Sequence, residues 1–293
     1  MNKKFQKILR SAVAESLGRY EYSPSEDTLR VQMCDIGRRM YERGYVAAND
    51  GNLCCRLGNG RFLCTPTGVS KGFMKPHMLC IVDENGCQLE GEWPCTSEIK
   101  LHLAIMREVP HIHAVAHAHS PYASAFAVAG RPVPPALMPE VEALLGPVPT
   151  APFALPGSKE LAESVIPFVR NNANTVLLSN HGAVGCDVTL EAAYFHLETL
   201  DSYLRTVVLA EKIGTPKPIS EQAVAGLLEW KRKNNVPDPR LPAGAVKTDI
   251  IPPAMKPAGE SSVDALTQEI LRRLSEKIEE SPELLKIWQS VKD

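Results

Sequence analysis

Apolar residues follow two different periods along this chain, and each period predicts a different kind of element. A spacing of three or four residues is typical of amphipathic helices, and short apolar runs bounded by turn residues are typical of strands. The predicted helices cover residues 25–44, 99–107, 123–128, 156–171, 220–233 and a long segment from 189 onward. The predicted strands cover residues 49–57, 61–64, 78–82, 114–119 and 175–179, and the first two flank a glycine turn and predict a hairpin.

The two ends of the chain have patterns of their own. Residues 1–24 carry a helical stripe of apolar side chains and predict an N-terminal helical extension that packs on the body or on a partner. Residues 237–262 are rich in proline, glycine and alanine, which is typical of an extended linker. Residues 263–293 again carry an apolar face at helical spacing, and a short amphipathic helix of this kind needs a surface to pack on.

Composition narrows the functional classes. The 293 residues are 44% hydrophobic, enough to bury a sizeable core, and the formal net charge of −2 provides no basic field for nucleic acid or an anionic membrane surface. The N-terminus lacks the apolar segment of a signal peptide, and no apolar run approaches the ~20 residues of a membrane span, so we expect a cytoplasmic protein. We interpret the eight cysteines as reduced thiols that act as small buried hydrophobes, because no Cys-x-x-Cys pair occurs.

A pair of histidines lies in the apolar run 114–120. Residues i and i+2 of a strand face the same side, so His117 and His119 can contact one ion. A catalytic zinc site typically has three protein ligands and one open position, so a further ligand is expected elsewhere. Glu98, before a predicted helix, and His181, after another predicted strand, are the two candidates. Taken alone, a His-x-His pair is more often an accident of strand alternation than a metal site.

Three other histidines have simpler interpretations. His111 and His113 continue the alternation, but they follow Pro110 and precede the apolar core of the strand, so we expect them to be solvated. His196 falls within the long helix predicted from residue 189. We expect it to be packed or exposed on that helix rather than to bind a metal.

The segment 65–72 is a candidate phosphate cradle. It combines small hydroxyls, glycines that leave backbone N–H groups accessible, and Lys71. Backbone N–H groups oriented around a concavity bind anions. By itself the signal is weak, since Thr-Pro-Thr-Gly is also an ordinary turn composition.

Five short motifs occur together in one order. They are Gly51-Asn52, Thr65-Pro66-Thr67-Gly68, Thr96-Ser97-Glu98 followed by His102, His117-Ala118-His119-Ser120, and Asn180-His181-Gly182. In this order and approximate spacing, the chain resembles the class II aldolase/adducin family, most closely its L-fuculose-1-phosphate aldolases. The resemblance covers roughly residues 25–236, and five ordered motifs are far more specific than any one of them.

The resemblance implies a fold and an assembly. The fold would be α/β, a three-layer α/β/α domain with a mostly antiparallel central sheet, spanning residues 25–236. The chain would assemble as a homotetramer with C4 symmetry and with active sites at subunit interfaces.

The resemblance also implies a site and a reaction. Glu98, His117, His119 and His181 would hold Zn²⁺, although the same ligands would hold manganese or cobalt. A small phosphorylated sugar would be cleaved reversibly to dihydroxyacetone phosphate and L-lactaldehyde, the substrate being L-fuculose 1-phosphate or a relative such as L-rhamnulose 1-phosphate. Glu98 would be a ligand in the resting enzyme and the catalytic acid/base once substrate displaces it. The phosphate pocket would consist of Asn52, Thr67, Gly68, Thr96 and Ser97.

One departure from the family pattern leaves the substrate open. The family's fuculose aldolases use a tyrosine from a neighbouring subunit as a second proton donor, and its place here falls near residues 137–139, where no tyrosine occurs. Glu140 is a weak substitute, Tyr122 is a less favoured one, and Glu142 is given no role. Dehydratases and decarboxylases of phosphorylated sugars keep the three histidines and stay as alternatives.

Two further members of the family are disfavoured. The 4-epimerases usually carry aspartate at the position of Glu98, so glutamate favours an aldolase. A non-catalytic adducin-like domain normally lacks the metal set, which is intact in this chain.

The C-terminal pattern has two interpretations. Linker 237–262 plus helix 263–293 resembles the encapsulation peptides that carry enzymes into bacterial microcompartments, which would make shell proteins its partners and place the enzyme in the lumen. Alternatively, the helix docks on its own subunit or on a neighbouring one. Acidic and basic residues balance along the helix, which makes membrane binding the less expected outcome.

Overall fold

The computed structural model describes residues 24–234 and 236–241, which all belong to one compact unit of the chain. The predicted extension 1–24 lies almost wholly outside the described residues. The linker 237–262 lies largely outside them and the helix 263–293 entirely so. Across the described residues, no helix is both long and apolar enough to cross a membrane.

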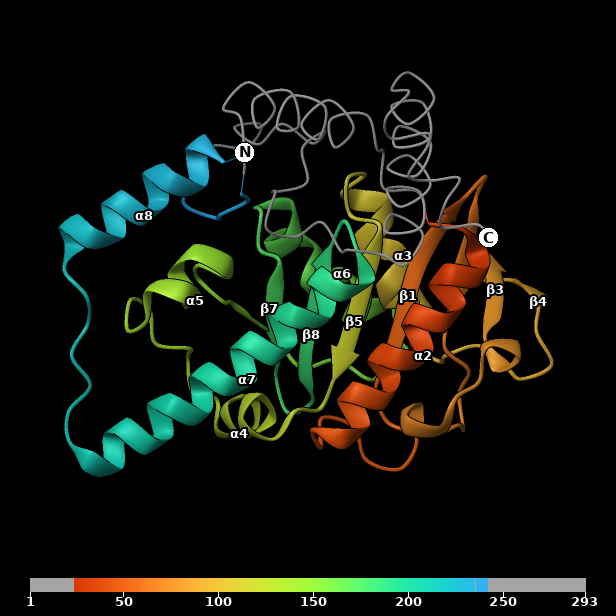
Figure 1. Cartoon of the computed structure of the whole chain (residues 1–293), viewed down its shortest axis with the longest axis horizontal. Coiled ribbons are helices and arrows are strands. Elements are labelled where there is room, and N and C mark those ends of the chain that lie inside the picture. Colours follow the sequence, from red (N-terminus) through yellow and green to blue (C-terminus); the bar gives the residue numbers. More distant parts are fainter. Residues whose placement is uncertain (1–23, 235, 242–293) are drawn as a thin grey trace, which may run out of the picture. The chain divides into compact units, whose positions relative to one another are not determined.

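An eight-stranded sheet forms the centre of the fold (Figure 1), with the strand order β4-β3-β2-β1-β5-β8-β7-β6. Every neighbouring pair is antiparallel except β6 and β7, which run parallel. The predicted mostly antiparallel sheet is therefore confirmed. The strands are β1 (Asn52–Gly58), β2 (Arg61–Cys64), β3 (Cys80–Asp83), β4 (Gln88–Glu90), β5 (Ala114–Ala118), β6 (Thr150–Ala151), β7 (Thr175–Leu178) and β8 (Gly182–Asp187).

Helices cover both faces of this sheet. The α-helices are α2 (Glu26–Glu42), α3 (Ile99–Glu108), α4 (Pro121–Ala129), α5 (Pro139–Leu144), α6 (Lys159–Arg170), α7 (Leu190–Ile213) and α8 (Glu221–Lys233). Two 3₁₀ turns, η1 (Lys71–Phe73) and η2 (Pro76–Met78), precede β3. In Figure 1, α2 and α7 cross the near face of the sheet.

Strand alternation divides the buried residues into two cores. In β1, Leu53 and Cys55 face the helices α2, α4 and α7, whereas Cys54 between them faces α3 and α6. This is the period-two pattern of a sheet that is buried on both sides. The predicted three-layer α/β/α architecture is therefore confirmed.

The helix boundaries follow from their caps. Ser25, Ser158, Thr189 and Ser220 each accept a backbone N–H of the first turn through the side chain, and so begin α2, α6, α7 and α8. These helices and α3 and α4 lie where periodicity predicts them. The short elements α5, β4 and β6, and the strand β8, have no counterpart among the predicted elements.

The pairing register brings the site's residues to one end of the central strands. Asn52 lies opposite His117, and His117 lies opposite Val184 on its other side. Gly182 begins β8 where it closely approaches β5, and a Cβ at this position would lie 2.4 Å from the carbonyl oxygen of Ala118. Glycine is thus needed for β8 to approach β5 directly after His181.

Two expectations need correction or refinement. The interpretation of all cysteines as buried is wrong in part, since Cys87 is exposed and Cys34 and Cys95 are half-buried. Among the histidines expected to be solvated, His113 is exposed and His111 is half-buried. His196 is expected to be either packed or exposed on its helix. It is packed, and its Nε2 lies 2.6 Å from Asp187 Oδ2.

Candidate metal centre

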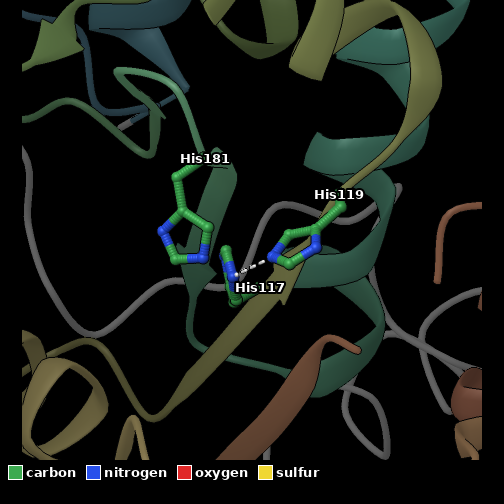
Figure 2. A group of neighbouring side chains, drawn as sticks. All are labelled: His117, His119 and His181. Carbon is green, nitrogen blue, oxygen red and sulfur yellow. Dashed lines mark hydrogen bonds between the residues drawn. The ribbon is translucent and has the colours of Figure 1, made fainter. Parts of the chain in front are cut away.

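Three imidazoles converge at the end of β5 (Figure 2). His117 is the last but one residue of this strand, His119 directly follows its last residue, and His181 comes from the turn between β7 and β8. One ligating nitrogen from each ring lies within 4.8 Å of the others. The Nε2 atoms of His117 and His119 are 3.1 Å apart. The structure therefore brings together three of the predicted ligands from two segments that are distant in the sequence.

Contacts behind the rings fix how His117 and His119 face the centre. His117 is fully buried, and its Nδ1–H donates to the carbonyl oxygen of Ala183 at 2.9 Å. That hydrogen bond selects the tautomer whose Nε2 lone pair points to the other histidines. On the opposite side, His119 Nδ1 lies 3.3 Å from Asp50 Oδ2.

Burial also keeps two of these rings neutral. It lowers the pKa of His117 to about 3, although the neighbouring Glu98 carboxylate acts in the opposite direction. Burial likewise lowers the pKa of His181. Neutral imidazole is the form that ligates a metal, so both rings are in the required state at neutral pH.

Glu98 lies directly before α3 and faces the same centre. Its Oε2 is 3.2 Å from His117 Nε2, and its Oε1 is 3.7 Å from His181 Nε2. Burial raises the pKa of this carboxyl group, but His117, a hydrogen bond from Asn52 and His181 outweigh that effect, and the pKa falls to about 2. Oε1 is buried and finds no hydrogen-bond partner among the described residues.

This donor set fits a divalent cation. The Nε2 atoms of His117 and His119 lie 3.1 Å apart beside the buried Glu98 Oε1, which has no hydrogen-bond donor among the described residues, and a cation between these atoms would be bound by all of them. Histidine nitrogen and carboxylate oxygen are the ligands that zinc takes in catalytic sites. Glu98, His117, His119 and His181 would therefore hold the ion.

Asn52 connects Glu98 to a further buried histidine. The Asn52 Nδ2–H donates to Glu98 Oε2 at 2.8 Å, and its Oδ1 lies 2.5 Å from His102 Nε2. Burial lowers the pKa of His102 to about 4, so the ring is neutral, and its Nε2–H is the donor to Asn52. The Asn52 side chain thus supports the carboxylate and keeps at most one N–H for a substrate phosphate.

The other predicted phosphate-binding residues lie on two adjacent segments. Pro66 and Cys95 form an isolated antiparallel bridge, and the Thr96 N–H donates to the carbonyl oxygen of Thr65 at 3.0 Å. Gly68, with a φ of +72°, is exposed, as are Thr67 and Ser97. Thr96 is buried, and its Oγ1 accepts the N–H of Glu98 at 3.3 Å. The segments are therefore held together beside the metal-site carboxylate.

The Lys71 side chain is directed into the protein, where it contacts the backbone, and does not face solvent. It is buried, and its Nζ donates to the carbonyl oxygens of Asn49 and Val69, both at 2.8 Å. Burial lowers its pKa to about 8. The expectation that its ammonium group directly cradles a phosphate is therefore not supported, because both bonds go to the chain itself.

Sequence reasoning assigned no role to Asp50 or His102. Asp50 immediately precedes Gly51-Asn52, and His102 is one helical turn after Glu98, so both positions carried a proximity signal. Of the considered substitutes for the family's tyrosine, Glu140 is exposed on α5 and Tyr122 is half-buried on α4. Glu142 is buried against Arg240, with 2.8 Å between Oε2 and the guanidinium nitrogen, which is a structural contact.

Comparison with known proteins identifies the family. The protein-family sequence model named Class II Aldolase and Adducin N-terminal domain matches residues 31–208, more than half of the chain. The protein therefore belongs to the class II aldolase/adducin family, and the resemblance carried by the five motifs is confirmed.

Individual relatives have two different activities. The 3-oxo-tetronate 4-phosphate decarboxylase of Escherichia coli O6:H1 is 32% identical over 193 residues, which cover 64% of this chain and 90% of that protein. The L-fuculose phosphate aldolase of Escherichia coli O157:H7 is 30% identical over 199 residues, which cover 68% of this chain and 91% of the aldolase. Relatives of this chain thus include both decarboxylases and aldolases.

Two solved structures share the fold of this chain. The crystal structure of YgbL from Klebsiella pneumoniae, described broadly as an aldolase/epimerase/decarboxylase, matches with a TM-score of 0.65 and 28% identity, covering 70% of this chain and 99% of that one. An L-fuculose 1-phosphate aldolase matches with a TM-score of 0.64 and 26% identity, covering 69% and 95%.

Proposed function

We propose that the protein is a zinc-dependent lyase that breaks a carbon–carbon bond in a small phosphorylated sugar. The favoured substrate is L-fuculose 1-phosphate or a related deoxy-ketose 1-phosphate such as L-rhamnulose 1-phosphate, giving dihydroxyacetone phosphate and L-lactaldehyde. One observation carries the proposal. Three imidazoles and the Glu98 carboxylate face a common centre, and the exposed Thr67-Gly68 segment lies beside it.

The metal would supply one part of the chemistry. Glu98, His117, His119 and His181 would hold it, and a bound divalent ion acts as a Lewis acid that stabilises negative charge developing on substrate oxygens. Zinc is our choice because nitrogen-rich sites with one carboxylate suit it, although cobalt and manganese accept the same ligands.

The chain's own residues would position the substrate. The exposed hydroxyls of Thr67 and Ser97 and the backbone around Gly68 provide hydrogen-bond donors for the phosphate. Binding this unreactive group orients the reacting carbons relative to Glu98, which converts binding energy into correct geometry.

Glu98 would move the proton. The Glu98 carboxylate takes the proton of the hydroxyl on the carbon that becomes the aldehyde, the carbon–carbon bond breaks, and the carboxyl group so formed gives that proton to the dihydroxyacetone phosphate carbon. Oε1 suits this role because it finds no hydrogen-bond donor among the described residues, whereas Oε2 is held by Asn52.

A decarboxylase acting on 3-oxo-tetronate 4-phosphate is the second candidate. Loss of carbon dioxide removes the need for a base that takes a hydroxyl proton, and the chain has no tyrosine at 137–139, where the fuculose aldolases it resembles provide their second proton-transfer group. Decarboxylases that are 32% identical to this chain support the same alternative.

A paired substrate assay separates the two. Zinc-loaded protein is incubated with L-fuculose 1-phosphate and L-rhamnulose 1-phosphate, with coupled detection of dihydroxyacetone phosphate, and in parallel with 3-oxo-tetronate 4-phosphate, with detection of carbon dioxide. We expect dihydroxyacetone phosphate release that Glu98→Gln lowers by at least about 100-fold, while Glu90→Gln, an exposed glutamate on β4, retains full activity. Decarboxylation of 3-oxo-tetronate 4-phosphate also leaves dihydroxyacetone phosphate, so the two arms are compared by substrate. Carbon dioxide from 3-oxo-tetronate 4-phosphate, with no dihydroxyacetone phosphate from either ketose 1-phosphate, would replace the aldolase with the decarboxylase. No turnover of any of the three substrates by zinc-bound protein would refute both.

A further inference from the structure

A cluster of thiols lies on the sheet next to the phosphate-binding segments. Cys54 on β1 is directly opposite Cys64 on β2, and Cys64 is directly opposite Cys80 on β3, so all three side chains face the α3 and α6 side of the sheet. Cys95 joins them through the bridge between Pro66 and Cys95, because it packs against the same core. All eight cysteines are free thiols.

Cys64 and Cys95 are neighbours that differ in accessibility, because Cys95 is paired with Pro66, two residues after Cys64, and both side chains pack into the same core. Cys64 is fully buried, whereas Cys95 is half-buried. The Cys64 thiol donates a hydrogen bond to the Cys95 sulfur, which lowers the pKa of Cys95 to about 7. The same bond, together with burial, raises the pKa of Cys64 well above its usual value. Redox-sensitive sites combine a partly exposed cysteine of low pKa with a neighbouring resolving cysteine.

This pair also lies directly before both phosphate-binding segments. Cys64 precedes Thr65, and Cys95 precedes Thr96. The backbones of Thr65 and Thr96 are joined by a 3.0 Å hydrogen bond. Any displacement of the two sulfurs is therefore passed on to the segments that carry Thr67, Gly68 and Ser97.

We propose that Cys95 is a hydroperoxide-sensitive modification site, and that Cys64 resolves it into a reversible disulfide that lowers activity. The Cys95 thiolate attacks the peroxide oxygen, so that a sulfur–oxygen bond forms, the oxygen–oxygen bond breaks, and the alcohol, or water from hydrogen peroxide, leaves with a proton. The Cys64 sulfur then attacks the sulfenic acid, so that the disulfide forms and water leaves. Two thiols are oxidised and one peroxide is reduced, and an added dithiol reverses the reaction.

The bond would distort the site by drawing the two sulfurs together. A disulfide holds its sulfurs about 2 Å apart, roughly 1.5 Å closer than two sulfurs in van der Waals contact. A displacement of about 1 Å in a substrate-positioning segment lowers turnover by roughly 100-fold. We therefore expect a loss of turnover of about 10- to 100-fold on oxidation. Formation of the disulfide does not depend on the proposed reaction, whereas the loss of turnover rests on it.

Peptide mapping tests the bond directly. The full chain is treated with hydrogen peroxide, its remaining thiols are alkylated, and it is digested without reductant by trypsin and by an endoprotease that cleaves after glutamate. Fragment 62–71 then carries Cys64 alone and fragment 93–98 carries Cys95 alone. We expect these two fragments to be joined, and to separate after dithiothreitol.

Matched variants test the mechanism. Cys95→Ser should abolish the link and the peroxide sensitivity, whereas Cys87→Ser, at the exposed cysteine before β4, should leave both unchanged. Cys64→Ala should leave Cys95 trapped as a sulfenic acid detectable with dimedone. Peroxide inactivation that persists in Cys95→Ser, or a link from Cys95 to a fragment other than 62–71, overturns the proposal. If no substrate is turned over, the affinity for inorganic phosphate, measured by calorimetry before and after oxidation, replaces turnover as the readout, and an unchanged affinity overturns the switching role.

Discussion

Asn52 provides the sharpest test of how the metal centre is built. The residue is buried, with 6% exposure, and its side-chain amide lies between Glu98 Oε2 at 2.8 Å and His102 Nε2 at 2.5 Å. Asn52→Ala removes both contacts and leaves two buried polar groups without a partner. Each such group costs about 1–3 kcal/mol, so we expect a loss of about 3 kcal/mol in the free energy of unfolding.

The same change should weaken metal binding. The hydrogen bond from Asn52 helps to keep the Glu98 carboxyl group ionised, and without it the pKa of Glu98 rises and the side chain loses its fixed orientation. Loss of a partner behind a metal ligand typically lowers affinity by about 10- to 100-fold. Zinc affinity is measured by competition with a chromogenic chelator, and stability by thermal unfolding of the metal-free chain, where about 3 kcal/mol corresponds to roughly 6–12 °C.

Two variants make the result specific to Asn52. Asn171→Ala changes an exposed asparagine at the end of α6 and should alter neither quantity. His102→Ala removes one contact of Asn52 but leaves the bond to Glu98, so zinc affinity should fall less than in Asn52→Ala. An Asn52→Ala protein with unchanged zinc affinity and unchanged thermal stability would refute the assigned supporting role.

Three further changes probe other parts of the structure. His181→Ala should lower zinc affinity by more than about 100-fold, whereas His113→Ala, exposed before β5, should not, as measured by metal content after dialysis. Asp238→Ala should lower the free energy of unfolding by about 3–5 kcal/mol, because it leaves the buried Lys231, 2.8 Å from Asp238 in the wild type, without its counter-ion; an unchanged melting temperature would contradict this. Burial lowers the pKa of Lys71 to about 8, so above pH 8 the folded chain loses a proton that the unfolded chain keeps up to about 10.5. Stability relative to Lys71→Met should therefore rise between about pH 8 and 10 in thermal unfolding, and a flat difference would show that Lys71 does not titrate there.

Most of the fold could be predicted because its signals are local. The helices α2 and α7 combine a periodic apolar face with a side-chain cap at Ser25 or Thr189, and both begin where these signals place them. The short helix α5 could not be predicted, because its six residues form a helix only against α7 and α8. The two-residue strand β6 likewise exists only through its parallel pairing with β7, a contact between distant segments.

The candidate site likewise has a part that the sequence predicts and a part that only the folded structure shows. The spacing of His117 and His119 follows from strand alternation, and the ordered sequence motifs add Glu98 and His181 to the ligand set. The contacts that orient these ligands are tertiary, so they have no local signal. Only the folded chain shows that Ala183 accepts the His117 Nδ1–H.

The arrangement explains why the ligands lie on central strands. Three imidazoles and a carboxylate with a buried, unsatisfied oxygen repel or lack partners when no cation is bound, so they reduce the stability of the metal-free fold. The strands β1, β5 and β8 tolerate that cost because they are paired on both edges and covered by helices on both faces. A ligand that binds only the folded chain raises the free energy of unfolding, and the increase grows with the logarithm of its affinity. A cation bound at this centre would therefore stabilise the fold where the unpaired ligand side chains destabilise it. The paired central strands and the ligand side chains that lack partners are therefore two parts of one binding site.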